Sequence, residues 1–273
     1  MSTTTAIPDI DSMKAKLKAT WAAGDYDRFS RYMEQDARFF YEQLDVPAGC
    51  KLLDVACGSG QVALWAARDG VDVTGVDIAP NQIQRAQIRA AAEGLKARFV
   101  EGDAESLPFE DASFDVVLSL IGAMFAPRPD LVARELLRVC SPGGTIAMGN
   151  WTAEGFVGLM FKTIAKFIAP SGMPSPVLWG NEKVVRERLG PGVAELKMTR
   201  RHYTLTYPFS PADVVEFFRQ YYGPMNRAFA SLDESSAEKL RAELEALWSE
   251  NNLGNDELTI AKGEYLEVIA IRA

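Results

Sequence analysis

Three aspartates accompany a glycine-rich segment, and their positions suit the binding of a charged nucleoside. Asp54 precedes Gly58-Ser59-Gly60, where glycines let the backbone approach a ligand closely and a following helix offers free N–H groups. A carboxylate at Asp54 is poorly placed for a pyrophosphate, but it suits a ligand with an ammonium and a sulfonium. Asp77 can accept hydrogen bonds from both hydroxyls of a ribose, and Asp103 can accept one from an exocyclic adenine amine.

Secondary-structure elements must bring these aspartates together. Between residues 50 and 150 the chain alternates between strand and helix patterns, as a parallel sheet requires. We expect strands at 51–57, 71–77, 97–103, 114–120 and 145–150, with helices at 61–69, 80–93 and 127–139 and a turn at 141–144. Such βαβ units form a parallel sheet with helices on both faces. The three aspartates then lie at the carboxyl ends of neighbouring strands, where open α/β sheets bind ligands.

The alternation breaks after residue 150. We expect an apolar helix at 155–169, a strand at 198–209, helices at 210–222 and 233–251, and a closing strand at 265–272. The two late strands lack a short crossover helix, so they predict an antiparallel edge with helical insertions as a cap. The chain thus divides into an N-terminal helical lid (1–45), an α/β core (46–150), and cap insertions with the last two strands (151–273). The fold class is a doubly wound, mostly parallel α/β sheet.

Composition narrows the classes of function. The 273 residues are 48% apolar and 24% charged, which is typical of a globular protein, and the net charge of −8 argues against a nucleic-acid partner. The three cysteines indicate neither a disulfide framework nor a metal site. The N-terminus lacks the features of a signal peptide, and no apolar run is long enough to span a membrane. We therefore expect a cytoplasmic protein; the oligomeric state is not readable from the sequence.

The region from about residue 50 to 150 closely resembles the Rossmann-like (class I) S-adenosylmethionine methyltransferases, in particular the ubiquinone/menaquinone C-methyltransferase type and its small-molecule relatives. The matching segments are Leu-Leu-Asp-Val-Ala-Cys-Gly-Ser-Gly at 52–60, Val-Asp-Ile at 76–78, Glu-Gly-Asp-Ala at 101–104, Leu-Pro-Phe at 107–109, Ser-Phe-Asp-Val-Val at 113–117, and Leu-Arg-Val-Cys-Ser-Pro-Gly-Gly at 137–144. The resemblance implies a seven-stranded sheet with an antiparallel last hairpin, and methyl transfer from S-adenosylmethionine to a small molecule, with S-adenosylhomocysteine as the product.

The resemblance also implies roles for single residues around the cofactor. The methionine part would be surrounded by Asp54, Ala56, Gly58 and Gly60; the ribose and adenine would contact Asp77, Ile78, Asp103 and Ala104; the sulfonium would lie above Ser119 and Leu120. Gln82 stands where an apolar residue often contacts the adenine. The family diverges beyond residue 150, so the resemblance carries no implication about the substrate.

Aromatic and apolar residues outside the motifs are candidates for covering the ligands. Trp21 and Tyr26 could fold over the cofactor as a lid, where an aromatic ring gains cation–π attraction to a sulfonium. Met124 and Phe125 follow the fourth strand and Trp151 follows the fifth, so we expect them at the substrate site. Simple core packing remains open as the alternative for each aromatic residue.

A general base is needed only if the methyl acceptor carries a proton with a high pKa. The sole histidine, His202, is the first candidate, although an exposed or hydrogen-bonded strand histidine is the favoured interpretation. Tyr32, Glu34 and Tyr41 are further candidates.

The apolar helix expected at 155–169 has two interpretations. It could touch a membrane surface, or its apolar face could cover the substrate as a lid. The acidic net charge favours the lid.

Two other functions remain as alternatives. Gly58–Ala63 fits the G-x-G-x-x-A fingerprint of nicotinamide-dependent oxidoreductases. Asp54, Asp103 and the antiparallel last strand count against that function. A non-catalytic protein that binds S-adenosylmethionine is the second alternative.

Overall fold

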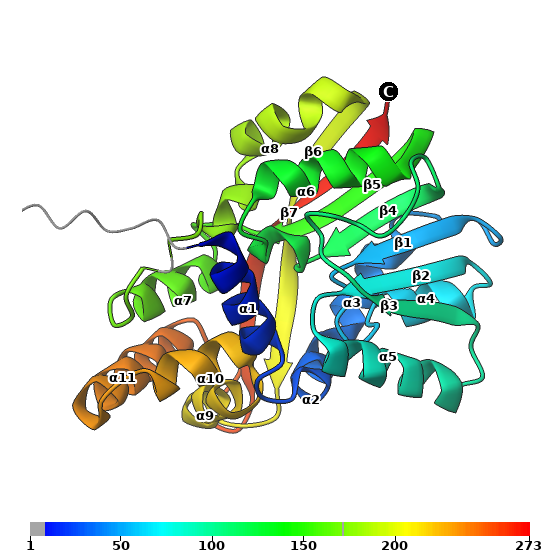
Figure 1. Ribbon diagram of the computed structural model, residues 1–273. Helices are drawn as coiled ribbons and strands as arrows, with labels where there is room; N and C mark the ends of the chain where they lie inside the picture. The colour runs from blue at the N-terminus through cyan, green and yellow to red at the C-terminus, as the bar shows by residue number, and fades with distance from the viewer. Residues whose placement is uncertain (1–8, 171) are drawn as a thin grey trace, which may run out of the picture.

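A computed structural model describes residues 9–170 and 172–273, and it centres on one mixed sheet (Figure 1). The segment 1–8, on which the expectation of no signal peptide depends, lies outside the described residues. The seven strands have the order β3-β2-β1-β4-β5-β7-β6. They are β1 (Lys51–Val55), β2 (Asp72–Asp77), β3 (Ala97–Glu101), β4 (Phe114–Leu120), β5 (Cys140–Trp151), β6 (Val193–Tyr207) and β7 (Thr259–Arg272).

The sheet is parallel from β3 to β5, and β7 runs antiparallel to both of its neighbours. The expected fold class is therefore confirmed, with the antiparallel strand one position in from the edge and β6 outermost. The central strands are buried almost throughout; Leu52, Leu53, Val117 and Leu118 have no measurable exposure. Such continuous apolar runs are what a parallel sheet covered on both faces requires.

Helices connect the parallel strands and pack against them. They are α4 (Ala63–Arg68), α5 (Pro80–Ala92) and α6 (Pro129–Val139), which agree with the expected helices to within a few residues at their ends. Both α5 and α6 begin with a proline in the first turn, a position that a proline favours because it needs no N–H donor there.

The remaining helices gather largely at one end of the sheet (Figure 1). The N-terminal segment forms α1 (Ile10–Trp21), α2 (Tyr26–Ser30), η1 (Arg31–Met33) and α3 (Glu34–Glu42). The insertion between β5 and β6 forms α7 (Phe156–Ala165), η3 (Pro176–Gly180), α8 (Glu182–Leu189) and η4 (Gly190–Gly192). The insertion between β6 and β7 forms α9 (Pro211–Tyr221), α10 (Gly223–Ala230) and α11 (Glu234–Glu250). Because α7 follows β5 and α9–α11 follow β6, both groups start at the edge where β1–β4 end. This edge is the one that carries the aspartates.

The structure differs from the sequence expectations in three places. Residues 141–144 form no separate turn: β5 already starts at Cys140, and its pairing with β4 shifts register across this stretch, where Gly143 has a φ of 75°. Both β6 and β7 are longer than expected, because they pair with each other along nearly their whole length. The helices α8 and α10 were missed, since each is short and follows a proline- or glycine-containing segment.

No helix within residues 9–170 and 172–273 is both long and apolar enough to cross a lipid bilayer.

Candidate functional site

The loop after β1 has a backbone conformation that few residues adopt. Ala56, Gly58 and Gly60 have φ values of 58°, 54° and 86°. At the end of β4, Ile121 also has a positive φ, 56°. Left-handed conformations at residues other than glycine cost energy and occur where the surrounding structure imposes them, most often at binding sites.

The loops after β1 and β4 touch each other closely. A Cβ on Gly122 would lie 2.6 Å from the carbonyl oxygen of Ala56 and 2.7 Å from its Cβ. The Ser119 hydroxyl joins the same two strands: it donates to the Val55 carbonyl at 2.7 Å and accepts from the Ala123 N–H at 2.9 Å. Ser119 is therefore used in holding the two loops together, and it does not line a cavity.

Asp77 fixes the glycine loop from the end of β2. One carboxylate oxygen accepts from the Gly58 N–H at 2.9 Å and the other from the Ala79 N–H at 2.8 Å. Burial raises the pKa of Asp77, and these two hydrogen bonds act against that rise. A carboxylate oxygen accepts more than one hydrogen bond, so both oxygens retain capacity for a ligand.

Asp54 is buried at the end of β1, with only 2% of its surface exposed. Its carboxylate accepts from the Ala63 N–H, at the start of α4, at 3.1 Å. Burial raises the pKa of Asp54 to about 7, and the nearby carboxylate of Asp77 adds to the shift. A cationic ligand beside the two carboxylates would favour their ionised forms.

Asp103 forms contacts with the N-terminal segment. The Lys14 ammonium of α1 pairs with Asp103 and lies 2.7 Å from a carboxylate oxygen of Glu105, which itself binds Arg128 at 2.8 Å. The other Asp103 oxygen accepts from the Glu105 N–H at 2.9 Å. The expected adenine acceptor is thus also the anchor of α1.

Asp54, Asp77 and Asp103 line a first cavity. The space between its walls is about 1000 Å³ when the part open to solvent is included. Of the residues expected at the cofactor it contains Trp21, Tyr26, Asp54, Ala56, Gly58, Asp77, Ile78, Gln82, Asp103, Ala104 and Leu120, and Phe125 of the expected substrate residues. Among the described lining residues three are carboxylates and none is lysine, arginine or histidine. The cavity therefore favours a ligand with positive charge.

The N-terminal segment closes this cavity. A Cβ on Gly58 would lie 3.3 Å from the Tyr26 ring, so the ring covers the glycine loop. The Gln82 amide donates to the Trp21 carbonyl at 3.5 Å, while its buried oxygen has no hydrogen-bond partner among the described residues. Because Gln82 lines the first cavity, this side-chain oxygen is a candidate acceptor for a ligand's hydrogen-bond donor.

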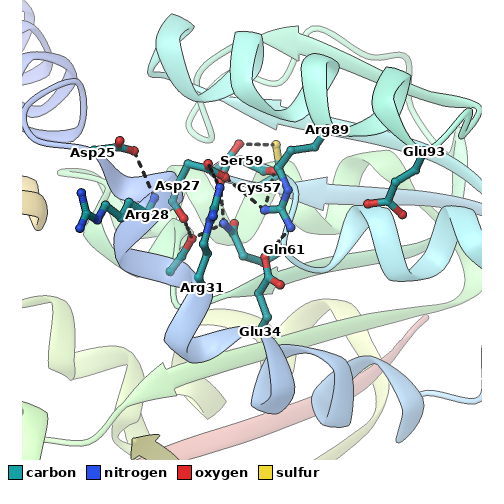
Figure 2. A network of polar contacts seen from close by, with 12 residues as sticks. Asp25, Asp27, Arg28, Arg31, Glu34, Cys57, Ser59, Gln61, Arg89 and Glu93 are labelled. Atoms are coloured by element: carbon teal, nitrogen blue, oxygen red, sulfur yellow. Dashed lines mark hydrogen bonds and ion pairs between the residues drawn. The ribbon is translucent and has the colours of Figure 1, made fainter. Parts of the chain in front are cut away.

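A polar network holds the N-terminal helices on the loop (Figure 2). Arg89 of α5 donates to the Ser59 carbonyl at 3.3 Å and pairs with Asp27 at 3.4 Å and with Glu34. The Gln61 amide lies 2.5 Å from the Ser30 hydroxyl and 2.6 Å from the Ser59 hydroxyl. Elements far apart in sequence are thereby bound to the same short segment.

A second cavity adjoins the first, and the space between its walls is about 420 Å³ when the part open to solvent is included. Both cavities share Trp21, Tyr26, Met33, Ile121 and Phe125. The remaining lining comes from β5, the cap and neighbouring elements: Phe29, Trp151, Phe156, Val157, Met160, Leu205, Phe218, Tyr222 and Trp248. The helix α7 thus turns part of its apolar face to this cavity.

Three other expected residues do not line either cavity. Gly60 lies against the Leu64 side chain, Met124 is 2% exposed within the core, and His202 is exposed on β6. The side chain of the neighbouring Tyr203 is buried and lines the first cavity. Because side chains alternate along a strand, His202 lies on the opposite face from Tyr203.

The other candidate bases are engaged elsewhere. Tyr32 packs against Tyr207 with ring centroids 5.1 Å apart, Glu34 pairs with Arg89, and burial raises the pKa of Tyr41. None of the three lines either cavity. The structure therefore brings most of the cofactor candidates together, without Gly60 and Ser119, and leaves every candidate base outside both cavities.

Several lining residues were missed by the sequence analysis. They are Leu17, Ser30, Met33, Ala37, Gln61 and Tyr203 in the first cavity, and Phe29, Leu205 and Trp248 in the second, among others. Most belong to elements distant from the motifs, so no local pattern marks them. The many aromatic residues of 11–45 are the one signal in the sequence that could have indicated some of them.

Comparison with known proteins gives the family. A family model described as "Methyltransferase domain" matches residues 53–148. An uncharacterized protein of Mycobacterium tuberculosis is 39% identical over 249 residues, which is 90% of each chain. Methyltransferase GfsG of Streptomyces halstedii is 42% identical over 118 residues, 42% of each chain.

A solved structure shares the fold. Phosphoethanolamine N-methyltransferase 2 of Haemonchus contortus, in complex with S-adenosyl-L-methionine, matches with a TM-score of 0.53 and 18% identity. The match covers 83% of this chain and 49% of the other.

Proposed function

Since the chain belongs to the class I S-adenosylmethionine-dependent methyltransferases, we propose that its first cavity binds S-adenosylmethionine and that a small-molecule methyl acceptor binds beside it. One observation carries the proposal: three carboxylates line the cavity at the carboxyl ends of the parallel strands, and none of its described lining residues is lysine, arginine or histidine. We divide the chain accordingly into a lid (1–45), a cofactor-binding core (46–150), and a cap that completes the sheet (151–273).

The residues of the cavity fit the cofactor. The ligand has a sulfonium and an ammonium, and the buried Asp54 and Asp77 would be stabilised in their ionised forms by such charges. The unpartnered oxygen of Gln82 matches a donor such as an adenine amine. The positive-φ loop at Ala56 to Gly60 lets the backbone come close to the ligand.

We assign the following work to the chain's own residues. Asp54 and the backbone of Ala56, Gly58 and Gly60 hold the methionine part, and Asp77 accepts from the ribose hydroxyls. Ile78, Gln82, Asp103 and Ala104 surround the adenine, while Leu120 borders the sulfonium. Trp21 and Tyr26 exclude water from the cavity that they cover. Ser119 acts indirectly, because its two hydrogen bonds tie the end of β4, which carries Leu120, to the end of β1 and to the segment that follows β4.

When bound, S-adenosylmethionine would supply an activated methyl group. The acceptor atom would form a bond to the methyl carbon while the carbon–sulfur bond breaks and its electron pair stays on sulfur. Any proton on the acceptor would leave to water. The enzyme then mainly provides proximity and alignment. This role agrees with the absence of histidine, cysteine, lysine or glutamate from the described lining of the second cavity. His202 is not needed for it.

Family membership decides against the nicotinamide-dependent alternative. The acidic first cavity supports the same conclusion, since a pyrophosphate would be repelled by Asp54 and Asp77. A nucleic-acid partner stays disfavoured by the net charge of −8, and a cytoplasmic location stays a prediction.

Calorimetric titration with S-adenosylhomocysteine, and with NADH in parallel, tests the cofactor. We expect saturable binding of the first and none of the second; the reverse result would overturn the proposal. Incubation with methyl-labelled S-adenosylmethionine and pools of phenols, amines and thiols then tests transfer directly.

A further inference from the structure

The second cavity has no assigned ligand, and its lining is unusual in carrying no charged side chain among the described residues. Resting on the proposed function, we propose that this cavity binds the methyl acceptor and selects an uncharged, flat, ring-containing molecule with one hydrogen-bond-accepting oxygen.

The position of the cavity fits an acceptor site. It shares five lining residues with the cofactor cavity, among them Trp21, Ile121 and Phe125. Ile121 follows Leu120, which borders the expected sulfonium. Two ligands that occupy adjoining cavities across these shared walls can bring a nucleophile and a methyl group within reach of each other.

Charge excludes several classes of acceptor. The only titratable side chains of the lining are Tyr26 and Tyr222, and burial raises the pKa of both, so both stay neutral at physiological pH. A phosphate or carboxylate group placed here would lose its hydration without gaining a cationic partner, and an ammonium group would meet aromatic faces but no carboxylate among the described residues. Acceptors that carry such a group are therefore selected against.

The shape of the walls favours a flat molecule. Trp248 lies edge-on to Phe156 with ring centroids 4.5 Å apart and to Phe218 at 5.2 Å. Trp21 makes similar contacts with Phe125 at 4.9 Å and Tyr222 at 6.0 Å. A further aromatic ring can add edge-to-face or offset-stacked contacts to such an array, which favours flat ring systems.

Within the described part of the chain, one buried polar atom of this lining lacks a hydrogen-bond partner. The indole N–H of Trp248 is buried and has no hydrogen-bond partner among the described residues, although its ring lines the cavity. A buried indole N–H usually finds an acceptor, and it can only donate. We assign it to the oxygen of the bound acceptor.

Matched probes test the inference on protein saturated with S-adenosylhomocysteine, so that only the second cavity is titrated. The probes are 2-naphthol, its charged analogue 6-hydroxy-2-naphthoate, and naphthalene, which lacks the oxygen. We expect 2-naphthol to bind at least tenfold more tightly than the naphthoate, because the carboxylate would be buried without a partner. Equal binding of the two, or no binding of 2-naphthol, would overturn the inference.

A substitution tests the polar contact. Trp248→Phe keeps a ring and removes the N–H, and we expect about fivefold weaker binding of 2-naphthol with unchanged binding of naphthalene. Trp179→Phe is the matched control, since Trp179 is equally buried, has an unpartnered N–H, and lines neither cavity. An equal loss in both variants would show that the effect is structural and would remove Trp248 from recognition.

The two proposals fail in different ways. If S-adenosylhomocysteine itself does not bind, the proposed function is wrong. If it binds and the naphthoate is preferred, the function stands and the assignment of the acceptor class is wrong.

Discussion

The two cavities share a wall, yet their chemistry is opposite. The first is lined by Asp54, Asp77 and Asp103 and by backbone in left-handed conformations. The second is lined by aromatic and aliphatic side chains without a charge among the described residues. This difference matches the two proposed ligands: the polar groups on the strand ends would hold a cationic cofactor, and the apolar groups on the cap would hold a neutral molecule beside it.

The origin of the two linings also differs. The acids and the glycine loop of the first cavity come from the continuous α/β core between β1 and β4. The second cavity combines α2, β5, α7, β6, α9 and α11. A change in the insertions can therefore alter the acceptor without altering the cofactor site, and the following predictions are arranged around that separation.

The largest expected effect is a loss of ligand affinity in the first cavity alone. Asp77→Ala removes the hydrogen bonds to the Gly58 and Ala79 N–H groups as well as those to the ribose. We expect about 30-fold weaker binding of S-adenosylhomocysteine by calorimetry, because hydrogen bonds to charged groups contribute roughly 1.5–3 kcal/mol. Asp72→Ala, at the exposed start of the same strand, is the control. Unchanged affinity in Asp77→Ala would place the ribose elsewhere.

A pH series tests the difference in charge between the two cavities, since among the described lining residues only those of the first cavity include carboxylates. Burial raises the pKa of Asp54 from its ordinary 3.8 to about 7, so ionisation is opposed in the ligand-free fold. Stability of the ligand-free protein should therefore decrease as the pH rises from about 4 to about 7. Cofactor binding favours the ionised carboxylate, so the Kd for S-adenosylmethionine should fall about tenfold between roughly pH 6 and pH 8.

The control for the pH series is Asp54→Asn, whose amide oxygen can still accept from the Ala63 N–H. Its affinity should be lower and nearly independent of pH, and binding of 2-naphthol should stay flat in both proteins. A slope as steep as in the unaltered protein would assign the titrating proton to another group.

A smaller effect is expected from loosening the wall that the cavities share. Arg89→Met removes the contacts to the Ser59 carbonyl, Asp27 and Glu34, which hold the N-terminal helices (Figure 2). We expect a loss of about 1–2 kcal/mol in the free energy of unfolding, since the pairs are only partly buried. Binding in both cavities should weaken about threefold, a modest effect because a flexible wall raises the ordering cost of binding.

Thermal denaturation and calorimetry measure this change, with Arg85→Met on the exposed face of the same helix as the control. If only the cofactor affinity falls, the N-terminal helices serve the first cavity alone.

The smallest expected effect concerns the histidine. His202 is exposed on β6 and lines neither cavity, so His202→Ala should leave methyl transfer to an identified acceptor within about twofold of the unaltered rate. A loss of tenfold or more in kcat would return His202 to the position of a base and would require the cap to rearrange in the complex.

The sequence by itself determined the core of the fold and most of the cofactor candidates. Strand ends, glycines and acids from Asp54 to Asp103 are local patterns, because each aspartate lies within two residues of the end of a strand. The period of the apolar residues therefore sufficed to place them at one edge of the sheet. His202 shows the limit of such reasoning, since residue type alone made it a candidate.

Only the tertiary structure decided which side chains cover the site. Tyr203 rather than His202 faces the first cavity because the pairing of β6 with β7 fixes which alternate residues turn inward. Trp248 reaches the second cavity through the packing of α11 against α7 and α9, and nothing in its own segment indicates that position. Contacts between distant segments depend on side-chain packing across the whole core, which a local pattern does not contain.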